Sequence, residues 1–93
     1  VGRDMVEKVV TVINEHGIHA RPASMLVETA GKFQSSVTLE NAGVLGDAKS
    51  IMGIMMLAAV HGTEVVVRCD GSDEADALAA VSSLFENRFG QES

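Results

Sequence analysis

A histidine and an arginine lie two residues apart at the point where the hydrophobic pattern of the chain changes. Both belong to Gly17–Ala23, which has the sequence Gly-Ile-His-Ala-Arg-Pro-Ala and contains the only proline of the chain. The imidazole of His19 is a nucleophile, and the guanidinium of Arg21 offers a planar fork of donors that fits phosphate oxygens. These residue types at this spacing predict a site that binds a phosphoryl group and accepts it at His19.

An amphipathic helix is expected to begin next to His19 and to position both side chains. Its apolar positions recur at helical spacing and are Ala23, Leu26, Val27 and Ala30. Gly31 follows them and is the residue type that commonly ends a helix. With His19 as the N-cap, we therefore expect a helix from Ala20 to about Ala30.

The start of that helix is suited to anions. The backbone N–H groups of Ala20 and Arg21 have no partner inside a helix that begins there, and the helix dipole adds about half a positive elementary charge. Pro22 is tolerated because its missing N–H is not needed in the first turn. We expect Ala20 and Arg21 to bind phosphate oxygens, with His19 as the nucleophile.

The rest of the chain alternates between strand and helix patterns. Strands are expected over Met5–Asn14, Ser36–Glu40, Val44–Asp47 and Thr63–Cys69. Helices are expected from Ile51 to Leu57 or Ala58, and from a cap at Ser72 or Asp73 to Asn87 or Arg88. The order βαββαβα predicts an α+β fold in which an open antiparallel sheet carries its helices on one face. A length of 93 residues predicts one domain.

Composition and charge exclude several classes of function. The net charge of -6 and the absence of Trp and Tyr argue against nucleic-acid binding. Cys69 is the single cysteine, which excludes an internal disulfide and favours a core position. The three histidines are scattered, so we expect no metal and no cofactor. No apolar run is long enough for a bilayer and no secretion signal is visible, so we expect a cytoplasmic protein without membrane insertion.

Two segments resemble a known family. Gly17–Ala23 is similar to the active-site signature of HPr, the histidine-containing phosphocarrier of the phosphoenolpyruvate-dependent sugar phosphotransferase system. Lys49–Gly53 resembles the regulatory serine segment of that family at the expected distance, and the similarity extends from about Met5 to Arg88. The resemblance implies an open-faced β-sandwich with a four-stranded antiparallel sheet and three helices on one face. It also implies a single HPr-like domain over residues 1–93, with a core from 5 to 88.

The resemblance implies a role in phosphoryl transfer as well. Enzyme I, charged by phosphoenolpyruvate, passes a phosphoryl group to Nδ1 of His19, and His19 passes it to an EIIA domain. Arg21 is expected to stabilise the charge during transfer. Such a protein is a monomeric carrier with a phosphohistidine intermediate, and it has no turnover of its own.

Ser50 is expected to have two roles. Its hydroxyl can cap the second helix, a contribution of about 1 kcal/mol. The resemblance also implies phosphorylation of Ser50 by HPr kinase/phosphorylase, which adds about two negative charges at a helix start. Beside a docking surface, this charge is expected to repel the acidic surface of enzyme I.

The second helix is apolar almost all round, although a short surface helix needs only one buried face. Ile54 and Leu57 are expected in the core. Ile51, Met52 and Met55 are expected to face the partner proteins, because methionine adapts to surfaces of different shape.

The alternative functions differ in the protein to which His19 would pass a phosphoryl group, or in whether it passes one at all. A nitrogen-type or purely regulatory phosphocarrier donates to a regulatory EIIA rather than to sugar permeases. Asp47, the net charge of -6 and the tail Phe85–Phe89, which resembles nitrogen-type relatives, favour this alternative, whereas Lys49–Gly53 favours the sugar type. A pure interaction module that binds a transcription regulator is disfavoured, because paralogues of that class lack the histidine. An autonomous enzyme is disfavoured further, since the sequence has no base–nucleophile pair, metal cluster or nucleotide loop.

Overall fold

Strands and helices alternate along the chain in the computed structural model, which describes residues 5–91. The strands are β1 (Val6–Thr11), β2 (Ser36–Asn41), β3 (Val44–Asp47) and β4 (Glu64–Asp70). The helices are α1 (Ala20–Ala30), α2 (Ile51–Met55), α3 (Glu74–Glu86) and α4 (Arg88–Gln91). The two ends of the expected domain, residues 1–4 and 92–93, lie outside the described residues.

The four strands form one antiparallel sheet in the order β1–β4–β2–β3, which confirms the predicted sheet. Strand β4 is central, and its Cys69 lies opposite Val6 of β1 and opposite Val37 of β2. Val65, Val67 and Cys69 are buried, and the residues between them are not. This alternation is the one expected when a β-branched strand covers a core with one face only.

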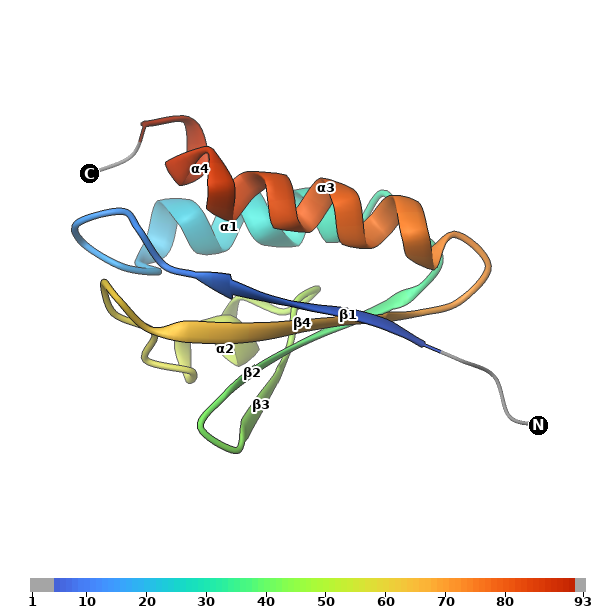
Figure 1. Ribbon diagram of the computed structural model, residues 1–93, viewed down its shortest axis with the longest axis horizontal. Coiled ribbons are helices and arrows are strands. Elements are labelled where there is room, and N and C mark those ends of the chain that lie inside the picture. The colour runs from blue at the N-terminus through green and yellow to red at the C-terminus, as the bar shows by residue number, and fades with distance from the viewer. Residues whose placement is uncertain (1–4, 92–93) are drawn as a thin grey trace.

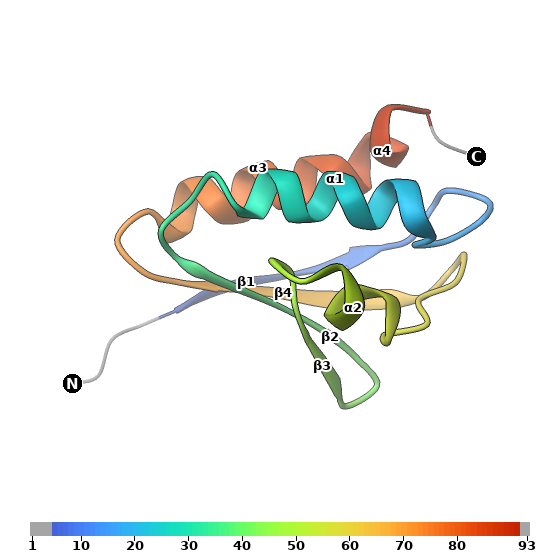
Figure 2. The ribbon, with the colours of Figure 1, turned by 180° about the vertical axis from the view of Figure 1, so that it is seen from behind.

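Helices α1 and α3 lie side by side over one face of the sheet, and the other face is left open (Figure 1). In the view from behind, α2 lies below α1 and next to β2 and β3 (Figure 2). The core fills the space between the helices and the sheet, and its largest fully buried side chains are Phe85, Phe89, Leu26, Leu39 and Ile54. Burial of each such side chain contributes about 1.5–3 kcal/mol to folding. The predicted α+β fold class is confirmed.

The ends of two helices differ from the prediction. Helix α2 ends at Met55, before the predicted Leu57 or Ala58. The N–H groups of Leu57 and Ala58 bond three residues back, to Ile54 and Met55, and Ala58 has a left-handed φ of 51°. Helix α3 ends at Glu86, and α4 follows it as a short fourth helix within residues 5–91, where three helices were predicted. The cause is a run of left-handed residues that begins at Arg88, whose φ is 53°.

The first strand and the start of α3 also differ in detail. Strand β1 spans Val6–Thr11 and is shorter than the predicted Met5–Asn14. Asp73 precedes α3, as one of the two predicted caps, but its side chain makes no cap hydrogen bond. Its carboxylate instead accepts hydrogen bonds from the backbone N–H groups of Gln34 and Ser35, both at 2.9 Å. The start of α3 is thereby tied to the start of β2. Within residues 5–91, no helix has the length and apolar character needed to cross a membrane.

Candidate functional site

His19 lies at the N-cap of α1, where the sequence predicted it. Its backbone is extended (φ -94°, ψ -164°), and its carbonyl accepts the N–H of Ala23 at 3.0 Å as the helix begins. The imidazole makes no cap hydrogen bond, so it does not cover the N–H groups of the first turn. The Nε2 atom of the ring is buried, although the residue as a whole is only half-buried.

A tight loop between β1 and α1 holds His19 in place. The side-chain amide of Asn14 donates to the carbonyl of Gly17, and the N–H of Gly17 donates to the carbonyl of Asn14 at 3.1 Å. Gly17 has a φ of 69°, and a Cβ there would lie 2.6 Å from the carbonyl oxygen of Ala59. Only glycine fits at this close contact. The N–H of Ile18 donates a hydrogen bond to the same carbonyl oxygen of Ala59 at 2.9 Å, which holds the loop against that segment.

Asn14 is the positioning residue that sequence reasoning missed. It is fully buried (0% exposed), and one oxygen of its side chain, Oδ1, is buried without a hydrogen-bond partner. A polar residue at the end of a strand normally indicates a solvent-exposed turn. No local signal indicated that Asn14 is buried, because its burial depends on its hydrogen bonds with Gly17 across the loop.

Arg21 reaches back over the start of α1 toward the end of the chain. It is exposed, and its Nη1 donates to the carbonyl oxygen of Phe89 in α4 at 3.4 Å. Ala20, the first residue of α1, is exposed as well. His19, Ala20 and Arg21 thus stand at the N-cap and in the first turn of α1. These are the groups that an anion-binding helix start requires.

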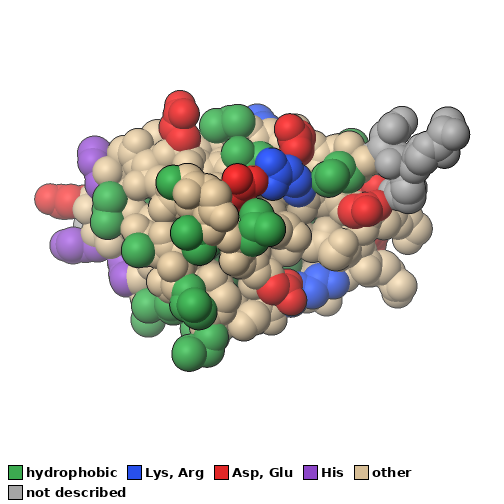
Figure 3. Space-filling model, turned by 90° about the horizontal axis from the view of Figure 1, so that it is seen from below, with side chains coloured by type: hydrophobic (Ala, Val, Ile, Leu, Met, Phe, Trp, Pro, Cys, Tyr) green, Lys and Arg blue, Asp and Glu red, His purple; other side chains and the backbone are tan. Residues whose placement is uncertain are grey.

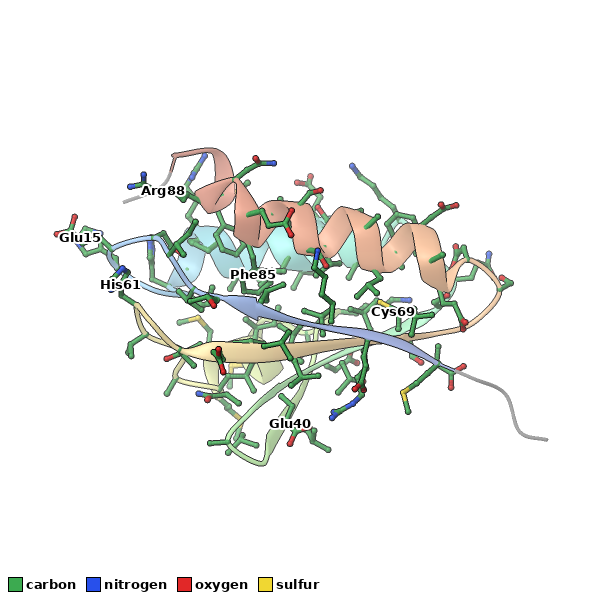
Figure 4. The ribbon with its side chains drawn as sticks, viewed as in Figure 1. Glu15, Glu40, His61, Cys69, Phe85 and Arg88 are labelled. Atoms are coloured by element: carbon green, nitrogen blue, oxygen red, sulfur yellow. The ribbon has the colours of Figure 1, made fainter. Side chains whose placement is uncertain are left out.

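Two other histidines lie at the same end of the molecule. The ring of His16 meets the ring of His19 edge to face, with 5.9 Å between the ring centroids. Glu15 and His61 extend from neighbouring loops at this end (Figure 4). Even so, no group of three or more His, Cys, Asp or Glu within residues 5–91 is placed to hold a metal ion.

Ser50 caps α2, as the sequence predicted. Its hydroxyl accepts the N–H of Gly53 at 3.1 Å, and its own N–H donates to the carbonyl of Asp47 at 3.0 Å. The neighbouring Lys49 directs its ammonium group to the carbonyl of Phe33, 2.9 Å away. Ser50 is half-buried, and it begins the helix that carries the exposed apolar residues.

The predicted docking residues are exposed: Ile51 is 46%, Met52 72% and Met55 42% accessible. Ile54 and Leu57 are buried at 0% and 3%, as predicted for core positions. Met56, which was not singled out, is also exposed, at 71%. Hydrophobic side chains gather near the end of the molecule that carries the histidines (Figure 3). The site therefore has an apolar surface next to it.

Comparison with known proteins gives consistent results. The family model for the PTS HPr component phosphorylation site matches residues 6–87. The chain is 52% identical over 88 residues to a protein named phosphocarrier protein HPr from Xylella fastidiosa (strain Temecula1), and covers 99% of it with 95% of its own length. It is 44% identical over 88 residues to the phosphocarrier protein HPr of Treponema pallidum (strain Nichols), and covers 100% of it with 95% of its own length.

Solved structures of the same kind superpose on this fold. The crystal structure of HPr-C-His from Thermoanaerobacter tengcongensis has a TM-score of 0.90 at 41% identity, with 95% of this chain and 99% of that chain covered. The phosphocarrier protein HPr from Bacillus anthracis has a TM-score of 0.85 at 38% identity, with 89% and 99% covered.

Proposed function

Because this chain belongs to the HPr family, the phosphocarrier proteins of the phosphotransferase system, we propose that His19 is the residue that carries the phosphoryl group. The lone pair of Nδ1 attacks the phosphorus of the phosphohistidine on enzyme I. A P–N bond forms at His19 while the P–N bond on enzyme I breaks, and its electron pair returns to the donor imidazole. The same exchange then moves the phosphoryl group to an EIIA domain.

The burial of Nε2 of His19 carries this proposal. For Nδ1 to attack, the ring proton has to reside on Nε2, and the structure encloses that nitrogen. A phosphoryl group on Nδ1 would then lie on the other side of the ring from the buried Nε2. There it meets the N–H groups of Ala20 and Arg21 and the guanidinium of Arg21. The site supplies positive charge without a metal, which suits a carrier that has to release the group again.

Phosphorylation by enzyme I tests the proposal directly. The protein is incubated with enzyme I and labelled phosphoenolpyruvate, and the label is then tested for acid lability, which is the property of a phosphohistidine. We expect acid-labile label on the native protein and none on His19→Ala. His16→Ala is the matched control, because it removes the neighbouring imidazole, and it should still be labelled. Label retained on His19→Ala would overturn the assignment.

We propose sugar transport as the pathway, with a nitrogen-type carrier as the second candidate. The second candidate is favoured by the exposed Asp47 and by the tail, where Phe89 packs against Phe85. The rates of labelling by a sugar-type and a nitrogen-type enzyme I separate the two. A faster reaction with the sugar-type enzyme supports the first candidate, and the reverse ratio supports the second.

Regulation at Ser50 is proposed on the geometry of its cap. A phosphate on this hydroxyl would lie at the start of α2, beside the exposed Ile51 and Met52 that we propose as contacts for enzyme I and EIIA. Two added negative charges would weaken docking to an acidic partner. Incubation with HPr kinase/phosphorylase and ATP should shift the native protein in a Phos-tag gel and leave Ser50→Ala unshifted. An unshifted native band would contradict this proposal.

We propose that the protein is a cytoplasmic monomer whose docking surface is free to bind partner proteins. Covering Ile51, Met52 and Met55 with a second copy would remove the surface offered to enzyme I and EIIA. One solved relative, from Thermoanaerobacter tengcongensis, is an HPr dimer. Light scattering on the eluted protein should give the mass of one chain, and a dimer mass would contradict the proposal.

A further inference from the structure

The turn at the end of the described chain is held in a conformation that its residues do not favour by themselves. Arg88, Phe89 and Gly90 have φ values of 53°, 51° and 72°, all in the left-handed region. For the two non-glycine residues this conformation is unfavourable, so other contacts have to maintain it. Phe89 is fully buried, and its ring packs edge to face on Phe85 with 5.1 Å between centroids. The buried ring anchors the turn.

The anchored turn directs a backbone carbonyl at the site. The carbonyl oxygen of Phe89 accepts a hydrogen bond from Nη1 of Arg21 at 3.4 Å. In both ribbon views α4 lies over the start of α1, the element that carries Arg21 (Figures 1 and 2). At this length the bond is weak, and its acceptor is neutral. A phosphoryl group on His19, doubly charged and close by, outcompetes such an acceptor for the guanidinium.

We infer that the turn Arg88–Gly90 is a positioning element for Arg21. It holds the guanidinium near the start of α1 while His19 is unmodified, and it yields the guanidinium to the phosphoryl group during transfer. An ordered guanidinium loses less conformational freedom when the phosphoryl group arrives, which lowers the barrier of the transfer step. The inference rests on the proposed role of His19 and assigns the turn Arg88–Gly90 a part in that reaction.

Gly90 offers a way to open the turn without disturbing the core. Nothing lies within 4 Å of a Cβ placed there, so a side chain meets no clash, and only the left-handed φ opposes substitution. Gly90→Val should therefore open the turn, whereas Gly90→Asn should keep it, because asparagine tolerates this conformation. Gly43→Val is the control for strain elsewhere: Gly43, in the β2–β3 turn, has a φ of 87° and equally open surroundings.

The measurement is kcat and KM for phosphorylation of each variant by phospho-enzyme I. We expect Gly90→Val to lower kcat roughly three- to tenfold, the loss expected for one ordinary hydrogen bond, with KM little changed. Gly90→Asn and Gly43→Val should retain the native kcat. Loss of the ring contact between Phe85 and Phe89, followed by NMR, verifies that the turn has opened. If the Gly90→Val protein keeps the contact between Phe85 and Phe89, the variant Phe89→Ala takes its place in the same comparison.

Repeating the substitution in an Arg21→Ala background separates positioning from general damage. If the turn acts through Arg21, opening it in that background has no further effect on kcat. An equal loss with and without Arg21 would overturn the inference, as would an opened turn with native kcat. The outcome is distinct from failure of the proposed function, in which the native protein itself would not be phosphorylated.

Discussion

His19 and Ser50 are the N-cap residues of α1 and α2, and only one of them caps its helix with its side chain. Ser50 folds its hydroxyl back onto the N–H of Gly53, so the start of α2 is closed by its own side chain. His19 makes no such cap, and the first turn of α1 stays available to an anion. On the roles proposed here, a phosphate on Ser50 would disturb an existing hydrogen bond, whereas a phosphate on His19 would meet N–H groups that the imidazole does not cap.

The cap at Ser50 has a measurable contribution to stability. Replacement of Ser50 with alanine leaves the N–H of Gly53 without its side-chain acceptor, and we expect the free energy of unfolding to fall by about 1 kcal/mol. Ser50→Asn is the matched control, because asparagine caps helices as well as serine does. Urea unfolding of the three proteins tests this, and equal stability of Ser50→Ala and the native chain would contradict the role of the cap.

Asp73 makes stability depend on pH. The hydrogen bond from the Ser35 hydroxyl, followed by the backbone N–H of Gln34, lowers the pKa of the Asp73 carboxyl below its usual value. A lowered folded-state pKa contributes stability that is present above the unfolded-state pKa and is lost as the pH falls below about 4. Asp73→Asn should flatten this acid limb of the stability curve. Ser35→Ala, which removes the largest cause, should flatten it in part, and an unchanged limb in both variants would refute the linkage.

At the scale of elements, the contact between β3 and α2 depends on two glycines. A Cβ on Gly46 would collide with the backbone carbonyl of Gly53, so the strand and the helix approach more closely than larger residues permit. The same contact fixes where α2 presents Met52 and Met56 to solvent. Packing in this small region thus sets the position of the docking surface relative to the sheet.

Substitution at Gly46 tests that contact. Gly46→Ala forces β3 and α2 apart, and we expect a loss of about 1–3 kcal/mol in the free energy of unfolding, as for overpacked cores. Ala42→Gly, in the adjacent β2–β3 turn, should act in the opposite direction. Ala42 has a φ of 50°, so glycine relieves left-handed strain of about 1 kcal/mol. Thermal unfolding should separate the two variants, and Gly46→Ala with native stability would show that the elements can shift freely.

The sequence predicted the elements that local pattern determines. The alternation in β4 and the apolar stripe of α1, ended by Gly31, were sufficient to place both. Local pattern failed where the conformation depends on distant partners. The left-handed Ala58 follows α2 without a glycine to signal it, and α4 exists because Phe89 is buried against Phe85.

The same limit applies to the candidate site. His19 and Arg21 could be located from residue types and spacing, because a helix start suited to anions is a local feature. The burial of Asn14 and the contact of Arg21 with Phe89 could not, since each depends on segments far away in the chain. Sequence therefore located the groups that we propose to react, and structure added the residues that hold them.

At the scale of the whole molecule, ion pairs lie on the open face of the sheet, and exposed methionines lie near the site. On the open face of the sheet, Arg68 bridges Glu7 at 2.8 Å and Glu40, which keeps both carboxylates paired. These hydrogen bonds, first that of Glu40, raise the pKa of Arg68. The exposed methionines Met52 and Met56 instead lie on the segment that packs beside α1 and the site. The end with the histidines is therefore the face suited to partner proteins.

The rate at which a thiol reagent labels Cys69 measures how often the fold opens. Cys69 lies in the central strand β4, is fully buried (0% exposed) and has its pKa raised to about 11, first by burial and then by the nearby Glu74 and Asp73. A thiol reagent can react only when the sheet opens, so we expect labelling at least about a thousandfold slower than in the urea-unfolded chain, given ordinary domain stability.

The pH dependence of that labelling distinguishes global from local opening. If Cys69 reacts only in the unfolded chain, the opened thiol has its ordinary pKa, and the labelling rate corrected for stability should level off above about pH 8.5. If the reagent reaches the folded protein, the rate should keep rising toward the raised pKa of about 11. The register places Val6 of the edge strand β1 opposite Cys69, so fraying of β1 is the local opening that would expose it. Urea dependence settles the distinction, because global opening gives the same slope for labelling as for equilibrium unfolding, whereas fraying of β1 gives a much smaller slope.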